Sequence, residues 1–119
     1  MYKILIADDE ELVRGGIKFI LDWDSLGFTI CAEASNGQEA LESILKLKPD
    51  LVILDIQMPK LSGIEVVKLA QEQNFKGKFI ILSGYSDFKY AQEAIQYGVT
   101  YYFCVFGKNC RNFVTQTTT

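Results

Sequence analysis

The 119-residue sequence contains no histidine, which excludes a histidine-based catalytic triad and any metal site with histidine ligands. Cysteine is scarce. Cys31, Cys104 and Cys110 show no CxxC spacing, so we expect thiols in a reducing cytoplasm rather than disulfides or a zinc site. No apolar run approaches the roughly 20 residues that a membrane span requires, and the first residues lack the apolar region of a signal peptide. Because the chain has no histidine, any histidine chemistry must come from a partner.

Neither sign of charge dominates. The 12 Lys and Arg residues and 15 Asp and Glu residues give a formal net charge of −3. The basic residues are scattered, so the chain shows no electrostatic footprint for nucleic acid. Apolar residues, in contrast, make up 49 % of the chain, enough at this length for one compact domain with a substantial core.

Short, continuous apolar runs indicate the strands. Residues 4–7, 51–54 and 79–82 are runs of this kind, and each ends at a polar residue. Such runs are typical of strands buried on both faces of a parallel sheet. Residues 28–34 are less uniformly apolar and suit a more peripheral strand, and residues 100–106 are interpreted as a fifth strand.

Helical periodicity lies between these strands. Val13, Ile17, Ile20 and Leu21 follow the spacing of one helix face. Three further helices are indicated by Leu41, Ile44 and Leu45, by Ile64, Val67 and Ala70, and by Ala91, Ala94 and Ile95. Strands alternating with helices through right-handed crossovers predict an α/β fold, a doubly wound parallel sheet of five strands.

Local signals agree with these helix boundaries. Asn36 precedes Glu39 by three residues and Ser62 precedes Glu65 by three, which is the spacing of a capping box. Gly98 follows the fourth predicted helix, where a left-handed C-cap is expected.

Ligands of parallel α/β sheets bind at the carboxyl ends of the strands, and three predicted strands end there in polar residues. The first ends at Asp8 and Asp9, the third at Asp55 and the fourth at Ser83. Clustered carboxylates repel unless a cation neutralises them, and oxygen ligands favour Mg²⁺. A carboxylate beside that ion can accept a phosphoryl group. A structural interpretation stays open here, in which these Asp residues cap a helix or end a turn.

The order and spacing of these residues resemble the receiver domain of bacterial two-component response regulators. The resemblance rests on Asp8-Asp9, the strand ending in Asp55, Met58-Pro59 followed by Gly63, and Ser83-Gly84. It covers roughly residues 2–100 and implies the flavodoxin-like strand order 2-1-3-4-5.

The resemblance implies a role for each matching position. Asp55 looks like the phosphoacceptor. Asp8, Asp9 and Asp55, with the backbone carbonyl of Gln57, look like the ligands of Mg²⁺. The hydroxyl of Ser83 would bind the phosphoryl group.

The resemblance also implies a switch residue and partners. Tyr102 stands where the family has an aromatic switch residue. The implied phosphoryl donor is a phosphohistidine on a sensor histidine kinase, and the family often forms homodimers. The implied function is phosphorelay signal transduction, and the protein would not be a turnover enzyme.

Two segments resemble one particular group of receivers. Residues 21–28 and 83–91 resemble those of receivers joined to AraC-type helix-turn-helix domains. Transcription regulation would then act through a C-terminal DNA-binding domain that is missing from these 119 residues.

The end of the chain departs from the family pattern. Val105 occupies the position of the family's Lys and Phe106 that of its Pro. Lys108 could substitute only with a different strand register or a looped-back side chain. Residues 107–119 also lack the apolar periodicity of a last helix. We therefore expect a receiver domain at 1–106 and an atypical C-terminal tail at 107–119.

Other function classes remain. A pseudo-receiver would keep the fold for protein binding, with phosphotransfer impaired because Val105 supplies no cation. A flavodoxin-like cofactor binder would need a phosphate-cradling loop where this chain has acidic residues. An aspartate-nucleophile phosphatase usually has a second Asp where this chain has Gln57.

Overall fold

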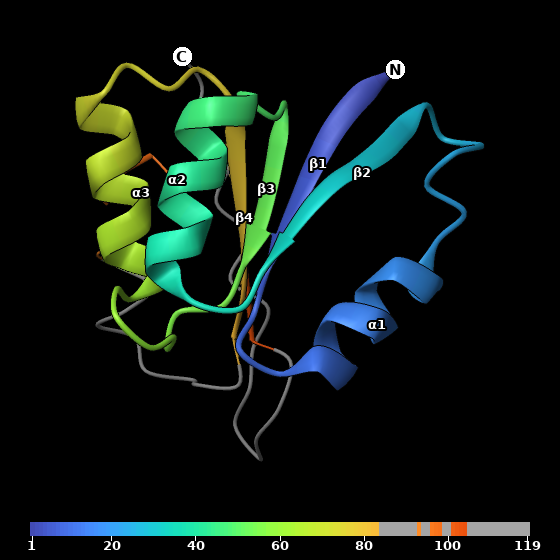
Figure 1. Ribbon diagram of the computed structural model, residues 1–119, viewed down its shortest axis with the longest axis horizontal. Helices are drawn as coiled ribbons and strands as arrows, with labels where there is room; N and C mark the ends of the chain where they lie inside the picture. The colour runs from blue at the N-terminus through green and yellow to red at the C-terminus, as the bar shows by residue number, and fades with distance from the viewer. Residues whose placement is uncertain (84–92, 94–95, 99–100, 105–119) are drawn as a thin grey trace.

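The computed structural model of the protein describes residues 1–83, 93, 96–98 and 101–104 (Figure 1). The elements are β1 (Tyr2–Ala7), α1 (Glu11–Ile20), β2 (Phe28–Ala34), α2 (Gly37–Leu47), β3 (Leu51–Leu54), α3 (Gly63–Glu72), β4 (Lys78–Ser83) and β5 (Tyr101–Cys104). All five strands of the described residues fall on segments that the sequence predicts as strands. The fourth predicted helix, at Ala91, Ala94 and Ile95, and the predicted tail at 107–119 lie outside the described residues.

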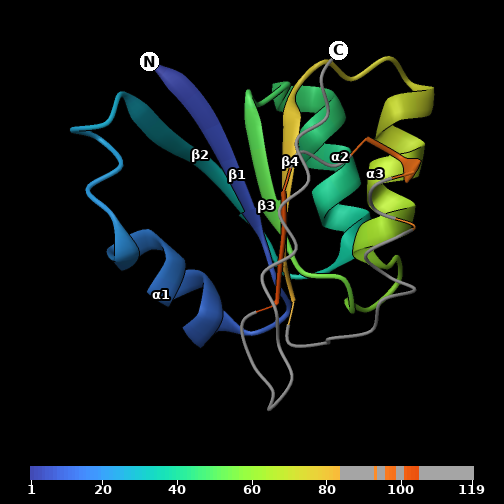
Figure 2. The ribbon, with the colours of Figure 1, turned by 180° about the vertical axis from the view of Figure 1, so that it is seen from behind.

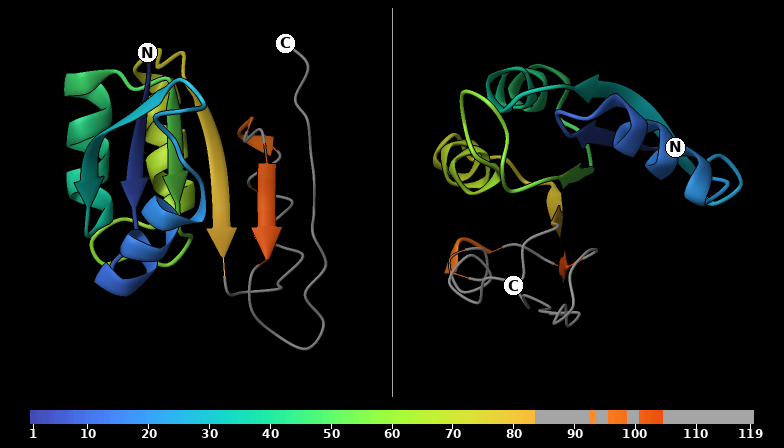
Figure 3. Two further views of the ribbon diagram at one scale, coloured as in Figure 1. Left: turned by 90° about the vertical axis from the view of Figure 1, so that its right-hand side faces the viewer. Right: turned by 90° about the horizontal axis from the view of Figure 1, so that it is seen from below.

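The strands form one parallel sheet in the order β2-β1-β3-β4-β5, which confirms the predicted fold class and strand order. Figure 3 shows this sheet with its strands side by side. Ala7 pairs with Leu54, and Leu54 pairs with Ile81. The carboxyl ends of β1, β3 and β4 therefore lie at one edge of the sheet.

Helices cover both faces of the sheet. α2 and α3 lie together on one face and α1 lies on the other (Figures 1 and 2). Leu5 and Val52 pack toward α2 and α3, whereas the alternate residues Ile4 and Ile53 pack with Ile17 of α1. The strands are apolar on both faces because both faces are covered.

The predicted face of α1 is only partly correct. Ile17 is buried, but Ile20 is 69 % exposed and Leu21, the C-cap residue, is 47 % exposed. Trp23 takes the place beside the sheet that Ile20 and Leu21 were expected to fill. Its indole N–H donates to the carbonyl of Ile17 at 3.0 Å and its ring packs edge-on against Phe28. Leu45 of α2, likewise predicted to face the core, is 39 % exposed.

The helix caps occur where the sequence predicts them. The side chain of Asn36 accepts from the backbone N–H of Glu39 at 2.9 Å, and Ser62 accepts from that of Glu65 at 3.2 Å. In both, the Glu carboxylate accepts from the side chain of the cap residue, whereas the usual capping box uses the cap's backbone N–H. Gly98 has the expected positive φ, +82°. None of the helices described here has both the length and the apolar character needed to cross a membrane.

Candidate functional site

Three carboxylates meet where β1 and β3 end. The backbone N–H of Asp55 donates to Ala7 at 3.1 Å and that of Asp8 donates to Ala34 at 3.0 Å, so both residues continue the ladder of the sheet. Asp8, Asp9 and Asp55 each offer an oxygen within 4.8 Å of the other two. Asp8 is buried, Asp55 is half-buried and Asp9 is exposed. This cluster is open to solvent on the side of Asp9.

The closeness of the carboxylates changes their protonation. Burial, and then the charges of Asp8 and Asp9, raise the pKa of Asp55 to about 6, against a partial opposing effect of the amides of Ile56 and Gln57. Burial also raises the pKa of Asp8, opposed by a hydrogen bond from the backbone N–H of Glu10. Ionisation of Asp8 and Asp55 is therefore unfavourable in this site, and a bound cation would stabilise the ionised carboxylates.

The turn after β3 fixes the Asp55 side chain. Its Oδ1 accepts from the backbone N–H of Ile56 at 2.8 Å. Gly63, the first residue of α3, packs so closely against this turn that a Cβ there would lie 2.2 Å from the Asp55 carbonyl oxygen. The sequence showed Gly63 as part of a motif, and the structure gives its reason: only glycine lets α3 begin here.

One polar residue at this edge was missed from the sequence. Arg14 of α1 donates from Nη1 to the backbone carbonyl of Asp8 at 2.6 Å and from Nε to Glu33 of β2 at 3.3 Å. Its signal was weak, because a single basic residue on a helix does not show what it contacts.

The remaining predicted site residues are placed only in part. Ser83 ends β4 and pairs with Cys104 of β5, and Tyr102 pairs with Ile81. Gln57 is exposed and follows Asp55 by two residues. Val105 and Lys108 lie outside the described residues. What these residues bind stays a prediction.

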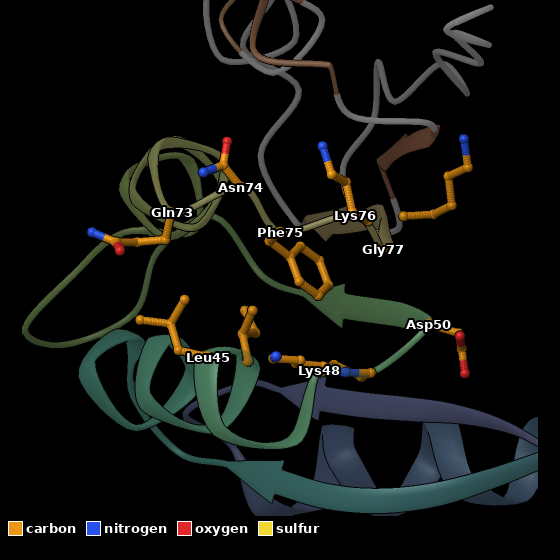
Figure 4. Close-up of a pocket in the computed structure, with 11 residues that line it drawn as sticks. Leu45, Lys48, Asp50, Gln73, Asn74, Phe75, Lys76 and Gly77 are labelled. Carbon is orange, nitrogen blue, oxygen red and sulfur yellow. The ribbon is translucent and has the colours of Figure 1, made fainter.

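A cavity of about 610 Å³ lies at the other edge of the sheet (Figure 4). It opens between the end of α2, at Leu45 and Lys48, and the segment from α3 to β4, where Phe75 lines it. Asp50 precedes β3 and Lys78 begins β4, so these are the amino-terminal ends of the strands. The acidic cluster at the carboxyl ends is therefore the stronger candidate for the functional site.

Comparison with known proteins defines the class. Residues 4–104 match the family model of the response regulator receiver domain. The chain therefore belongs to this family and is a receiver domain of a response regulator, as the sequence predicted.

Individual relatives agree. The transcriptional regulatory protein YesN of Bacillus subtilis is 44 % identical over 102 residues, which are 86 % of this chain and 28 % of that protein. The transcriptional regulatory protein HptR of Staphylococcus aureus is 39 % identical over 86 % of this chain and 40 % of its own length. This chain thus spans well under half the length of these curated relatives. None of these matches favours a pseudo-receiver.

Solved structures show the same fold. The REC domain of AraT, a response regulator from Geobacillus stearothermophilus, superposes with a TM-score of 0.79 at 38 % identity, covering 92 % of this chain and 82 % of that one. The response regulator domain of Thermotoga maritima CheB also gives 0.79, at 28 % identity and with 92 % and 81 % covered.

Proposed function

We propose that this receiver domain accepts a phosphoryl group on Asp55 from a phosphohistidine of a sensor histidine kinase. The observation that carries the proposal is the meeting of three carboxylates within 4.8 Å at the carboxyl ends of β1 and β3. Asp55 is suited to be the acceptor because its half-buried carboxylate is oriented by the amide of Ile56 and is mostly ionised at neutral pH with a pKa of about 6.

The donor set fits Mg²⁺. Asp8, Asp9 and Asp55 supply hard oxygen ligands, and Mg²⁺ keeps several waters and binds through a few carboxylates. We propose that the carbonyl of Gln57 completes the protein ligands. When bound, the ion would offset the charge that develops on the transferring phosphoryl group.

In the transfer, an oxygen of the Asp55 carboxylate forms a bond to phosphorus while the bond from phosphorus to the histidine nitrogen of the kinase breaks. The leaving imidazole takes up a proton, and the product is an aspartyl phosphate. Ser83 ends β4 at the same edge of the sheet, and we assign its hydroxyl to a phosphoryl oxygen. Tyr102, on the neighbouring β5, is proposed as the switch residue.

The relatives support a proposal for the wider role. Two of them are described as transcriptional regulatory proteins and are longer than this chain. We propose that the phosphorylated domain regulates transcription in the cytoplasm through a DNA-binding domain C-terminal to it, of the AraC type, and that it pairs as a homodimer. Its chemistry would be limited to accepting and losing one phosphoryl group, so it is not a turnover enzyme.

The acceptor is tested by incubating the protein with Mg²⁺ and acetyl phosphate and measuring its intact mass. Wild type should gain one phosphoryl group at Asp55, and Asp55→Asn should gain none. Asp24→Asn, a matched change at an exposed loop residue, should label like wild type. Labelling that persists in Asp55→Asn would place the acceptor elsewhere.

A further arm tests position 105. Val105→Lys would restore the family's cation and should raise the labelling rate. No labelling of wild type, together with labelling of Val105→Lys, would favour the pseudo-receiver, whose phosphotransfer is impaired by the missing cation; no labelling of either folded protein would contradict the acceptor role of Asp55.

A further inference from the structure

Arg14 joins three elements beside the acidic cluster. It lies on α1, its Nη1 donates to the carbonyl of Asp8 at the end of β1, and its Nε donates to Glu33 of β2. Its side chain is only 15 % exposed, so it is largely buried between these elements. Glu33 is also paired with Lys18, one turn further along α1, at 2.9 Å. Within the described residues, Arg14 therefore connects this network to the backbone of Asp8, at the start of the acidic cluster.

Arg14 binds a backbone oxygen that influences two of the three carboxylates. The carbonyl of Asp8 belongs to the peptide group that joins Asp8 to Asp9. A planar peptide turns as a unit, so anchoring its oxygen limits the directions in which both side chains can leave the backbone. Asp9 is exposed, and repulsion from Asp8 and Asp55 favours its rotation into solvent. An anchored peptide keeps the Cα–Cβ bond of Asp9 directed toward the cluster and so opposes the backbone part of that movement.

We propose that Arg14 is a positioning residue, which holds the peptide between Asp8 and Asp9 so that both carboxylates face Asp55 before a cation binds. This inference rests on the proposed metal site. It adds a residue that touches neither the cation nor the phosphoryl group.

The hydrogen bond to Glu33 orients the guanidinium of Arg14. A guanidinium pairs readily with carboxylates, and an Arg beside three of them would compete with a metal ion. Glu33 occupies the Nε side of Arg14, and Lys18 and Arg14 lower the pKa of Glu33, so this partner stays charged. Among the described residues, Nη1 of Arg14 therefore donates to the backbone carbonyl of Asp8 and not to the carboxylates of Asp8, Asp9 or Asp55.

Two physical effects of removing Arg14 have opposite signs. By charge alone, loss of a cation near the cluster should strengthen Mg²⁺ binding. By position, loss of the anchor should weaken it, and residues that orient metal ligands typically change affinity by about 10- to 100-fold. The sign of the change therefore separates a positioning role from a purely electrostatic one.

The experiment compares Arg14→Gln with Lys18→Gln. Both variants remove a positive charge paired with Glu33, and among the described residues Lys18 is hydrogen-bonded to Glu33 and not to Asp8 or Asp9. Mg²⁺ affinity is measured by calorimetry. Arg14→Gln should bind about 10-fold more weakly, and Lys18→Gln should bind equally or slightly more tightly. Arg14→Lys should be intermediate, because one ammonium cannot span both partners. Affinity in Arg14→Gln equal to or above that of wild type would overturn the inference.

A second measurement needs no metal. In the metal-free protein, NMR relaxation of the amides of Asp9 and Glu10 should show greater motion in Arg14→Gln than in Lys18→Gln, while the amides of β3 stay unchanged. Equal motion in the two variants would refute the positioning role. If wild type bound no Mg²⁺, the proposed metal site would fail, and this comparison would still decide whether Arg14 orders the loop.

Discussion

Replacing Gly63 with alanine should destabilise the protein, because the new Cβ would lie 2.2 Å from the carbonyl oxygen of Asp55, 3.0 Å from its carbonyl carbon and 3.1 Å from the Cα of Ile56. All three are backbone atoms, so no side-chain rotation can relieve the clash. The start of α3 or the turn after β3 must shift. Overpacking of this kind costs about 1–3 kcal/mol, and the better helix propensity of alanine returns up to about 1 kcal/mol.

Gly16→Ala is the matched control. Gly16 lies within α1, and a Cβ there would meet nothing within 4 Å. The same substitution should therefore stabilise the protein by about 0.5–1 kcal/mol through helix propensity alone.

Urea unfolding of both variants measures the difference. With a slope of about 1–3 kcal/mol per molar urea, the midpoint of Gly63→Ala should fall by about 0.5–1 M while that of Gly16→Ala rises. Amide shifts of Asp55 and Ile56 should move only in Gly63→Ala. A Gly63→Ala variant as stable as Gly16→Ala would refute the claim that close approach of α3 to the acceptor turn requires glycine.

Two further predictions concern charge and capping. Asp55→Asn should stabilise the metal-free protein at pH 7: folding raises the pKa of Asp55 from 3.8 to about 6, so ionisation costs stability as pH rises through this window and costs nothing below about pH 4. The shift corresponds to at most about 3 kcal/mol of unfolding free energy, and solvent screening at this half-buried group reduces it to about 1–2 kcal/mol. If the variant were stabilised equally at pH 4 and pH 7, ionisation of Asp55 would not be the cause. Asn36→Ala removes the acceptor for the Glu39 amide and should lower the thermal midpoint by the equivalent of about 1 kcal/mol. Lys46→Ala, on the exposed side of the same helix, should change it little, and equal losses in the two variants would argue against the cap.

The sheet could be predicted from the sequence because its signal is local. Each buried strand is an uninterrupted apolar run, and such runs need cover on both faces, as Leu5 and Ile4 show by packing toward opposite helices. The convergence of Asp8 and Asp55 followed from topology, since both residues end parallel strands that are neighbours.

What the sequence could not show depends on contacts between distant residues. Nothing near Arg14 in the chain indicates that its guanidinium reaches Glu33, 19 residues away. The exposure of Ile20 was also hidden, because Trp23 folds back from the following turn and fills the place that helical periodicity gave to Ile20. Periodicity describes a helix alone and cannot register a side chain that enters from outside it.

The length of β3 separates the cavity at one end of the sheet from the carboxylates at the other. Asp50 and Asp55 stand at its two ends, five residues apart along an extended chain, which corresponds to about 17 Å. That exceeds the Debye length of about 8 Å at physiological salt. A dye or a charge attached beside Lys48 or Lys76, which line the cavity at the far edge, would add almost no potential at the carboxylates. Labels placed there would therefore leave the titration of Asp55 almost unchanged.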